Sequence, residues 1–325
     1  MRALRYEGPR DIRVVDVPAP TAAQGEVVVD VAYTGICGTD LHIWSGHHAR
    51  AKTGLVIGHE FVGTLADPAG GLAAGSPVFV NPLLPCGRCP ACTDGEDRVC
   101  DVLRLVGIDR PGGAAEQVAV PERAIVPLPG GMDLKAAALI EPMSVCVRAV
   151  RRSGQRLGAR VHVVGAGPIG VLVARCARAR GAASVTISEP AQVRAEWARE
   201  AGFDVVPGDG AERYEVVYDC TGHPSVAPKV LDLVETGGTL VDVGMYAAPA
   251  QVDLPELMRR ELRIVGTCVY RPADVRVALR LIASGAVETA DLATVVGIDE
   301  AGGVFADLAA GKLLKVLFDP NGDRS

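Results

Sequence analysis

The pattern of hydrophobic and polar positions divides the chain into two parts of different character. Residues 1–35 predict short strands, most clearly at 26–33, where β-branched and polar residues alternate. Further strands are expected within 56–80, in GGAAEQVAV and in AIVPLP, separated by glycines and prolines. The first part is therefore expected to be rich in β-structure.

From about residue 135 the pattern changes to helices that alternate with buried strands. A helix is predicted in KAAALIEPMSVCVRAVRRS, interrupted at Pro142. The segments that follow alternate between strand and helix: RVHVVGAG, PIGVLVARCARARG, SVTISE, AQVRAEWAREAG, DVVPG, EVVYDCTG and GTLVDVGM. This alternation predicts a parallel, doubly wound sheet, which LRIVGTCVY (262–270) closes. The tail predicts one helix, ADVRVALRLIASG, and a final strand, KVLFD.

Length and charge narrow the class of protein. A chain of 325 residues is long for one core and natural for two domains. Its net charge is −6 and it has no block of Lys and Arg, which argues against nucleic acid or an anionic membrane as a partner. The N-terminus lacks the apolar run of a signal peptide, so we expect a cytoplasmic location, where the nine cysteines stay reduced.

Four cysteines, Cys86, Cys89, Cys92 and Cys100, lie in the run PCGRCPACTDGEDRVC with the spacing C-x2-C-x2-C-x7-C. Thiolates at these intervals can surround one tetrahedral zinc ion without a further ligand. Such a site has no open position, so the sequence predicts a structural zinc there and places the chemistry elsewhere.

A glycine-rich turn follows a predicted strand and opens a helix in HVVGAGPIG. Its glycines, Gly165, Gly167 and Gly170, match the pattern G-x-G-x-x-G, which allows a tight turn and close approach of a pyrophosphate. Glu189 ends the next strand, where a carboxylate can accept hydrogen bonds from a ribose. The expected cofactor-binding residues are Gly165, Gly167, Pro168, Ile169, Gly170, Glu189, Arg194, Cys220 and Val243.

The same segment bears on the choice between NAD and NADP. Glu189 would repel a 2′-phosphate, which favours NAD. Ser188 and Arg194 lie nearby and are the residue types found at NADP sites, so this alternative stays open at the level of sequence.

A second set of metal-ligand residues lies upstream. Cys37 is in TGICGTDLH, and His59 and Glu60 are adjacent in VIGHEFVG. Cysteine, histidine and glutamate can supply three protein ligands to a zinc ion that keeps a fourth position open, as catalytic zinc does.

The motifs GICGTDLH, GHEFVG, the four-cysteine loop, LIEPMSV, VVGAGPIG and DCTG follow one another along the whole chain. Together they resemble the zinc-dependent medium-chain alcohol and polyol dehydrogenases, in particular the branch of sorbitol and threonine dehydrogenases. The resemblance implies an α/β fold. A GroES-like β-rich catalytic domain would span residues 1–142 and 269–325, and a Rossmann domain with a doubly wound parallel sheet would span 143–268.

The resemblance also implies roles for individual residues around the catalytic zinc. Cys37 and His59 match zinc ligands of the family, and Glu60 matches the carboxylate that binds zinc in the sorbitol-dehydrogenase-like branch. Glu141, in LIEP, matches a glutamate that holds the zinc-bound water or replaces Glu60, and which of the two binds directly is left open. Cys146 lies five residues away and is interpreted as packing.

By the same resemblance, Thr39 accepts the alcohol proton and His42 passes it through the cofactor ribose to solvent. His47 and His48 fall in a variable loop and receive no role. The implied cofactors are two Zn²⁺ per chain and NAD rather than NADP.

The resulting hypothesis is an oxidoreductase that transfers hydride between NAD and a secondary alcohol of polyol, cyclitol or sugar-like type. The enzyme would act on a small-molecule substrate and would form a homodimer or a homotetramer. The alternatives are an amino-alcohol dehydrogenase of the L-threonine type and an NADP-dependent alcohol dehydrogenase. A zinc-less quinone reductase or non-catalytic relative usually lacks the cysteine motifs, and a zinc-dependent DNA-binding module is disfavoured by the pI of about 5.6.

Overall fold

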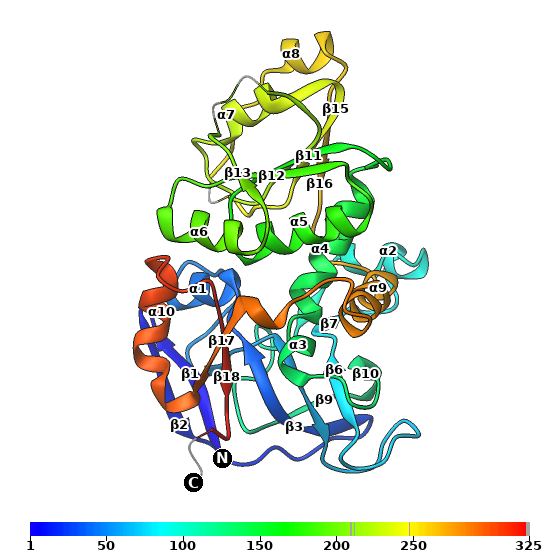
Figure 1. The fold of residues 1–325 in the computed structure, drawn as a ribbon. Helices are drawn as coiled ribbons and strands as arrows, with labels where there is room; N and C mark the ends of the chain where they lie inside the picture. Colours follow the sequence, from blue (N-terminus) through cyan, green and yellow to red (C-terminus); the bar gives the residue numbers. More distant parts are fainter. Residues whose placement is uncertain (209, 211, 247, 323–325) are drawn as a thin grey trace. The chain divides into compact units, whose positions relative to one another are not determined.

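The computed structural model describes residues 1–208, 210, 212–246 and 248–322 (Figure 1). The chain forms two compact units. The first unit contains Met1–Glu141 and Glu288–Ser325, and the second contains Pro142–Val287. No helix among the described residues is long and apolar enough to cross a membrane.

The first unit is built mainly of short strands. Its strands are β1 (Arg2–Gly8), β2 (Asp11–Asp16), β3 (Glu26–Gly35), β4 (Leu55–Val56), β5 (Glu60–Leu65), β6 (Pro77–Val80), β7 (Leu83–Leu84), β8 (Arg104–Leu105), β9 (Gln117–Pro121), β10 (Ile125–Pro127), β17 (Ala293–Gly297) and β18 (Lys315–Asp319). Its helices are α1 (Gly38–Trp44), α2 (Pro90–Thr93), α3 (Leu134–Ala137) and α10 (Ala301–Ala309).

The C-terminal strand joins the sheet formed by the first part of the chain. Within the described residues the main sheet has the order β10-β6-β5-β3-β18-β17, with β9 also paired to β3. β18 runs antiparallel to β3, with Leu317 opposite Gly35 and Phe318 opposite Thr34. This pairing brings the start of β18 beside the end of β3, where the first metal-ligand motif begins.

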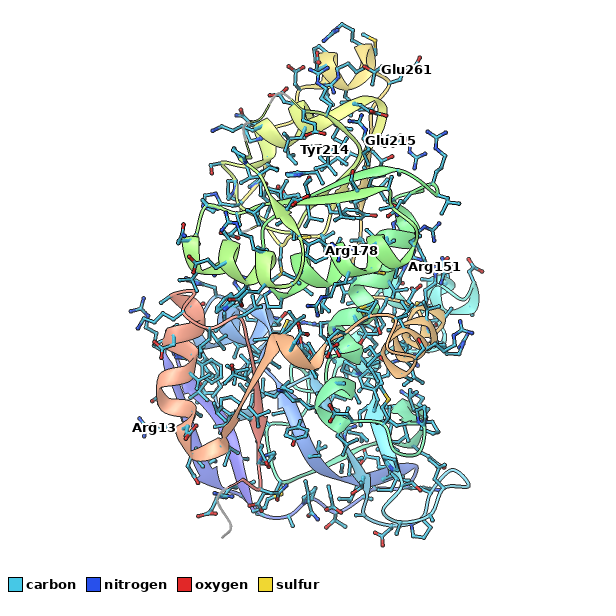
Figure 2. All side chains as sticks on the ribbon, in the orientation of Figure 1. Arg13, Arg151, Arg178, Tyr214, Glu215 and Glu261 are labelled. Carbon is cyan, nitrogen blue, oxygen red and sulfur yellow. The ribbon has the colours of Figure 1, made fainter. Side chains whose placement is uncertain are left out.

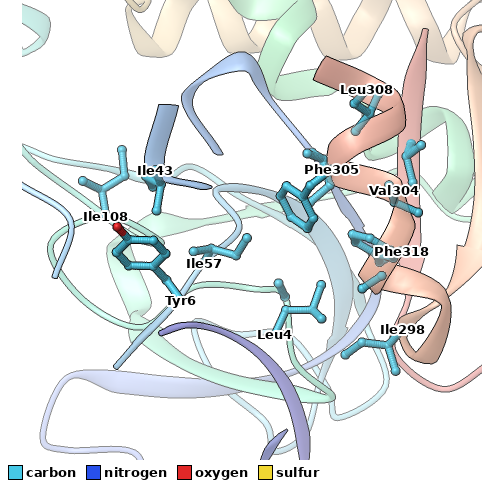
Figure 3. Packing of buried hydrophobic residues seen from close by; sticks show 14 residues of the cluster. Leu4, Tyr6, Ile43, Ile57, Ile108, Ile298, Val304, Phe305, Leu308 and Phe318 are labelled. Atoms are coloured by element: carbon cyan, nitrogen blue, oxygen red, sulfur yellow. The ribbon is translucent and has the colours of Figure 1, made fainter. Parts of the chain in front are cut away.

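A hydrophobic cluster ties the two ends of the chain together in this unit (Figure 3). Leu4 of β1 and Ile43 of α1 belong to the same buried cluster as Phe305 of α10 and Phe318 of β18. Burying side chains of this size contributes roughly 1.5–3 kcal/mol each. The C-terminal segment is therefore part of the core that supports α1.

The second unit alternates strands and helices. They are α4 (Ile140–Arg152), which begins at the boundary between the units, β11 (Arg160–Val164), α5 (Pro168–Ala179), β12 (Ser184–Ser188), α6 (Gln192–Glu200), β13 (Asp204–Val205), β14 (Tyr214–Asp219), α7 (Ala227–Val230), β15 (Val234–Asp242), α8 (Leu254–Arg259), β16 (Arg263–Gly266) and α9 (Pro272–Ala283).

The strand order confirms the predicted doubly wound parallel sheet. It is β13-β12-β11-β14-β15-β16, and every pair in it is parallel. The order reverses between β11 and β14, which is the point where such sheets bind ligands. On α5, the guanidinium of Arg178 stacks 4.0 Å from the ring centre of Phe203 and fixes the chain that enters β13 (Figure 2).

Two local predictions were wrong. α4 continues through Pro142 because this residue occupies the first turn, where a helix needs no N–H donor, and the break lies earlier, between α3 and α4. In the tail, the sequence analysis missed β17, which pairs with β18, and α10, whose apolar side chains belong to the buried cluster.

The compact units divide the chain at residues 142 and 288, whereas the predicted domain boundaries lie at 142/143 and 268/269. The segment with α9 groups with the second unit, where Arg151 of α4 donates to Asp274 of α9 at 2.7 Å. The assignment of 269–287 to the catalytic domain stays a prediction.

Candidate metal centres and nucleotide pocket

The four cysteines of the loop converge as the spacing predicted. The ligand atoms of Cys86, Cys89, Cys92 and Cys100 all lie within 4.8 Å of one another, and all four are free thiols. The Sγ atom of Cys92 lies 3.5 Å from that of Cys89 and 3.9 Å from that of Cys86. Four sulfurs at tetrahedral corners about 2.3 Å from zinc would be about 3.8 Å apart, so the cluster fits the ion.

Backbone N–H groups donate hydrogen bonds to sulfur atoms in this loop. The N–H of Cys89 donates to Sγ of Cys86 at 3.4 Å, and the N–H of Cys86 donates to Sγ of Cys100 at 3.3 Å. Amide donors at Arg88 and Cys89 lower the pKa of the Cys86 thiol to about 6. The local backbone thus favours the thiolate form of Cys86, the form that binds zinc.

The second cluster is assembled from separate elements. Cys37 caps the N-terminus of α1, and His59 and Glu60 stand at the start of β5. Their ligand atoms also lie within 4.8 Å of one another. His59 and Glu60 are buried, whereas Cys37 is half-buried.

Asp40, which the sequence analysis did not single out, orients this cluster. One carboxylate oxygen accepts from the N–H of Cys37 at 3.0 Å, and the other lies 3.7 Å from Nδ1 of His59. Burial lowers the pKa of His59, but the charges of Asp40 and Cys37 outweigh burial and raise that pKa well above its usual value. The cluster therefore attracts positive charge, as a metal site must.

A buried lysine completes the cluster from the far end of the chain. Nζ of Lys315, at the start of β18, donates to Oε2 of Glu60 and, at 2.8 Å, to the carbonyl of Ile36. A Cβ atom on Gly35 would collide with the Glu60 carboxylate, so glycine is needed beside this pair. The side chains of Lys315 and Glu60 are only 3% and 1% exposed, so their charges compensate each other without water.

Of the remaining predicted residues, Thr39 and His42 lie close to Cys37 in sequence, whereas Glu141 lies far along the chain. Thr39 Oγ1 is 3.8 Å from Sγ of Cys37, and His42 lies one turn further along α1, on the same side of the helix. Glu141 is buried at the start of α4, but it is not in the group whose ligand atoms lie within 4.8 Å. Its role as a zinc ligand stays a prediction.

The glycine turn has the form that a dinucleotide requires. Gly165 directly follows β11 with φ of 97°, and Gly167 caps α5 with open space where its Cβ would be. A Cβ on Gly170 would collide with the carbonyl of Gly165, so Gly170 serves close packing of α5 on the turn. The N-terminus of α5, where backbone N–H groups lack partners within the helix, begins directly at this turn.

Glu189 is held rigidly beside the turn. Its two carboxylate oxygens accept from the N–H groups of Ala166 and Ala191, each at 2.9 Å. A pocket of about 710 Å³ borders it. Of the residues predicted to bind the cofactor, those that line this pocket are Gly165, Gly167, Glu189, Arg194 and Cys220. Pro168, Ile169 and Gly170 lie in the first turn of α5, and Val243 directly follows β15.

The comparisons with known proteins agree with these sites. Residues 23–130 match the family model of the alcohol dehydrogenase GroES-like domain, and residues 168–284 match that of the zinc-binding dehydrogenases. The first match covers strands β3 to β10 and both metal-ligand motifs of the first unit, and the second covers most of the parallel sheet.

Whole-chain relatives extend the agreement. The chain is 36% identical to 2-dehydro-3-deoxy-L-galactonate 5-dehydrogenase of Pseudoalteromonas atlantica, with 95% of each chain covered. It is 30% identical to sorbitol dehydrogenase of Halalkalibacterium halodurans, covering 98% of this chain and 99% of that protein. A putative zinc-binding dehydrogenase of Sinorhizobium meliloti, solved with NADP, superposes with a TM-score of 0.92 at 31% identity, covering 98% and 99%.

These matches confirm the GroES-like and Rossmann architecture and an enzyme that uses zinc and a nicotinamide cofactor to act on a CH–OH group of a small molecule. The chain therefore belongs to the family of zinc-dependent medium-chain polyol dehydrogenases.

Proposed function

We propose that this enzyme interconverts a secondary hydroxyl and a ketone on a polyhydroxylated substrate, a polyol or a sugar acid, with NAD as the cofactor. The observation that carries the proposal is the cluster of Cys37, His59 and Glu60, in which His59 and Glu60 are buried and Cys37 is half-buried. Three protein ligands leave a position for the substrate oxygen, and zinc bound there would supply Lewis acidity.

The residues of the cluster have distinct proposed roles. Cys37 and His59 hold the catalytic zinc, with Glu60 or Glu141 as the third ligand. The Asp40 carboxylate lies 3.7 Å from Nδ1 of His59, and its negative charge favours a cation at this cluster. The four-cysteine loop holds a second zinc that stabilises the fold.

Proton transfer is assigned to α1. The Thr39 hydroxyl, next to Cys37, accepts the alcohol proton at Oγ1, and His42 passes the proton on toward solvent. Because both residues lie on one helix whose N-terminus Cys37 caps, the helix sets the proton acceptor and a metal ligand in one frame.

The proposed substrate class comes from relatives. Among them, those from Pseudoalteromonas atlantica and Escherichia coli are dehydrogenases of galactonate-type sugar acids, and others are sorbitol dehydrogenase and D-xylulose reductases. The test is a rate panel of L-galactonate, 2-dehydro-3-deoxy-L-galactonate, sorbitol, xylitol, a cyclitol and L-threonine, each with both cofactors. A polyol or sugar acid should give the highest kcat/KM, and L-threonine as the best substrate would contradict the proposal.

The preference for NAD is assigned to Glu189. Repulsion between its fixed carboxylate and a 2′-phosphate costs about 1–3 kcal/mol at a partly exposed site, or roughly ten- to a hundredfold in affinity. Glu189→Ser should weaken NAD binding and strengthen NADP binding, with Arg194 then free to contact the phosphate. A wild type that prefers NADP in kcat/KM would show that Glu189 is not the main determinant.

We further propose a cytoplasmic homodimer or homotetramer. β16 ends the described sheet order, and Ile264 on this edge strand is 40% exposed. Unpaired edge strands can extend across a twofold axis into a second copy. Light scattering at micromolar concentration should report at least a dimer, and cell fractionation should find the protein in the cytoplasm.

A further inference from the structure

A fully buried histidine lies behind the nucleotide pocket and has no part in the proposed chemistry. His162 is in the middle of β11, with no exposed surface. Its Nδ1 lies 2.8 Å from Oγ1 of Thr186, and its Nε2 lies 3.0 Å from Oγ of Ser188. Both hydroxyls belong to β12, so the ring bridges two residues on the same face of the neighbouring strand.

One of these partners opens onto the nucleotide pocket. Ser188 is 4% exposed and is among the residues that line the pocket of about 710 Å³. It directly precedes Glu189, and Arg194 lines the same pocket. The part of the Ser188 hydroxyl that does not bond to His162 is therefore available where the proposed site would hold the adenosine ribose.

The surroundings of Tyr214 bear on the direction of these hydrogen bonds. The ring of Tyr214 stacks on His162 at 4.7 Å between ring centres, and Figure 2 shows Tyr214 within the second unit. Burial raises the pKa of Tyr214, and a hydrogen bond that the Thr186 hydroxyl donates to the phenol oxygen lowers it. Glu212 raises the pKa of Tyr214 further, both as a negative charge and as a hydrogen-bond acceptor. This balance supports an arrangement in which the Thr186 hydroxyl gives its proton to Tyr214.

The donor and the acceptor of each hydrogen bond can then be assigned in turn. A carboxylate accepts but does not donate, so Glu212 takes the proton of Tyr214. Thr186, whose own proton points to Tyr214, can only accept from Nδ1–H of His162. Burial lowers the pKa of His162 to about 4, so the ring is neutral and its Nε2 is an acceptor. In this arrangement Ser188 donates to Nε2 of His162, which leaves only lone pairs for the pocket.

We infer that His162 is a positioning residue that fixes Ser188 as a hydrogen-bond acceptor in the nucleotide pocket, and that this arrangement disfavours a cofactor with a phosphate on its adenosine ribose. A ribose 2′-hydroxyl can donate to Ser188, whereas a phosphate offers mainly acceptors. The inference rests on the proposed nucleotide site and adds a second discriminating group beside Glu189.

The first test uses the unaltered protein. In histidine-selective ¹⁵N-labelled holoenzyme at neutral pH, the ¹⁵N shifts of His162 should show Nδ1 protonated and Nε2 bare, the tautomer that is less common in water. The resonance is assigned by its loss in His162→Leu or, if that variant does not fold, in His162→Asn. A neutral ring protonated at Nε2 would overturn the inference, because Ser188 would then be free to donate into the pocket.

The second test measures equilibrium binding of NADH and NADPH by fluorescence, without turnover. One neutral hydrogen bond corresponds to about 2- to 10-fold in affinity. Ser188→Ala should weaken NADH binding by this factor and should not weaken NADPH binding. His162→Leu should strengthen NADPH relative to NADH, because Ser188 loses its acceptor, and should have no further effect on the ratio in the Ser188→Ala background.

The control is Val161→Ala, a loss of buried volume on the opposite face of the same strand, which should leave the NADPH-to-NADH ratio unchanged. An unchanged ratio in both Ser188→Ala and His162→Leu would overturn the inference while leaving the proposed dehydrogenase function intact. A wild type that binds neither nucleotide would overturn both.

Discussion

The two cysteine-containing clusters of the first unit differ in how their ligands come together. The four-cysteine loop takes all its ligands from Cys86–Cys100, and three of the sulfurs are only half-buried. The ligands in the cluster of Cys37, His59 and Glu60 come from the N-terminus of α1 and the start of β5. Lys315 of β18 neutralises the Glu60 carboxylate. A local loop can close around a metal by itself, whereas a site with an open position needs a surrounding fold to keep its ligands in place.

The difference also appears in what balances the charges. Backbone amides support the thiolate of Cys86 in the loop. In the other cluster, buried side-chain charges face one another, Asp40 toward His59 and Lys315 toward Glu60. Buried charges are costly when one partner is lost, so the second cluster should be the more sensitive to single substitutions of its supporting residues.

The largest expected effect is on turnover. His59→Ala should lower kcat by at least about 10⁴-fold, equivalent to about 5.5 kcal/mol, because a ligand of the catalytic zinc is lost. NADH affinity should persist, since the nucleotide pocket lies wholly in the second unit. Steady-state rates and a fluorescence titration measure the two quantities. His47→Ala, at an exposed histidine, is the matched control, and undiminished turnover in His59→Ala would remove this residue from the mechanism.

Cys89→Ser should affect stability rather than chemistry. Zinc binding at a closed four-sulfur site contributes about 10–16 kcal/mol to folding in small zinc domains, and losing one sulfur should remove about 4 kcal/mol or more of this. Elemental analysis should show a fall from two zinc ions per chain toward one, with a lower Tm. Cys268→Ser, at an exposed cysteine, serves as the control. A disulfide between Cys86 and Cys100 in the purified protein would contradict the structural zinc site.

Lys315→Met tests the buried ion pair. In zinc-free protein, removing one partner leaves the Glu60 carboxylate uncompensated and should lower the free energy of unfolding by about 3–5 kcal/mol. Denaturant titration measures this change. Lys312→Met removes the exposed pair with Asp307 and should cost no more than about 1 kcal/mol. Equal effects of the two substitutions would show that the buried pair has no special importance.

The smallest expected effect compares two buried histidines. The pKa of His162 is lowered from 6.5 to about 4 by burial, while that of His59 is raised by Asp40 and Cys37 against burial. Between those two values the unfolded chain binds a proton at His162 that the native protein does not, so lowering the pH through this window should cost about 3 kcal/mol of stability.

The measurement is the difference in unfolding free energy between wild type and His162→Leu as a function of pH, with zinc present throughout. The stability of the wild type relative to the variant should decline steadily as the pH falls from about 6.5 to about 4. A difference that does not vary with pH would mean that His162 keeps an ordinary pKa in the folded protein.

Periodicity and turn chemistry were sufficient to predict much of the fold. The alternation of apolar strands and helices after residue 158 predicted the parallel sheet, because each strand is buried on both faces and each helix on one. Pro142 misled the analysis, since a proline ends a helix in its interior but not in its first turn. The short strand β17 and helix α10 lack strong signals and form on a sheet built elsewhere in the chain.

Spacing alone determined the four-cysteine loop and the glycine turn, because their partners lie within a few residues and local geometry decides whether they meet. Sequence motifs also marked Cys37, His59 and Glu60. Only the tertiary structure decided what surrounds them: the lysine that neutralises Glu60 is 255 residues away, and it arrives because β18 pairs with β3. His162 and Ser188, 26 residues apart, meet for the same reason, since the register between neighbouring strands is a property of the folded sheet.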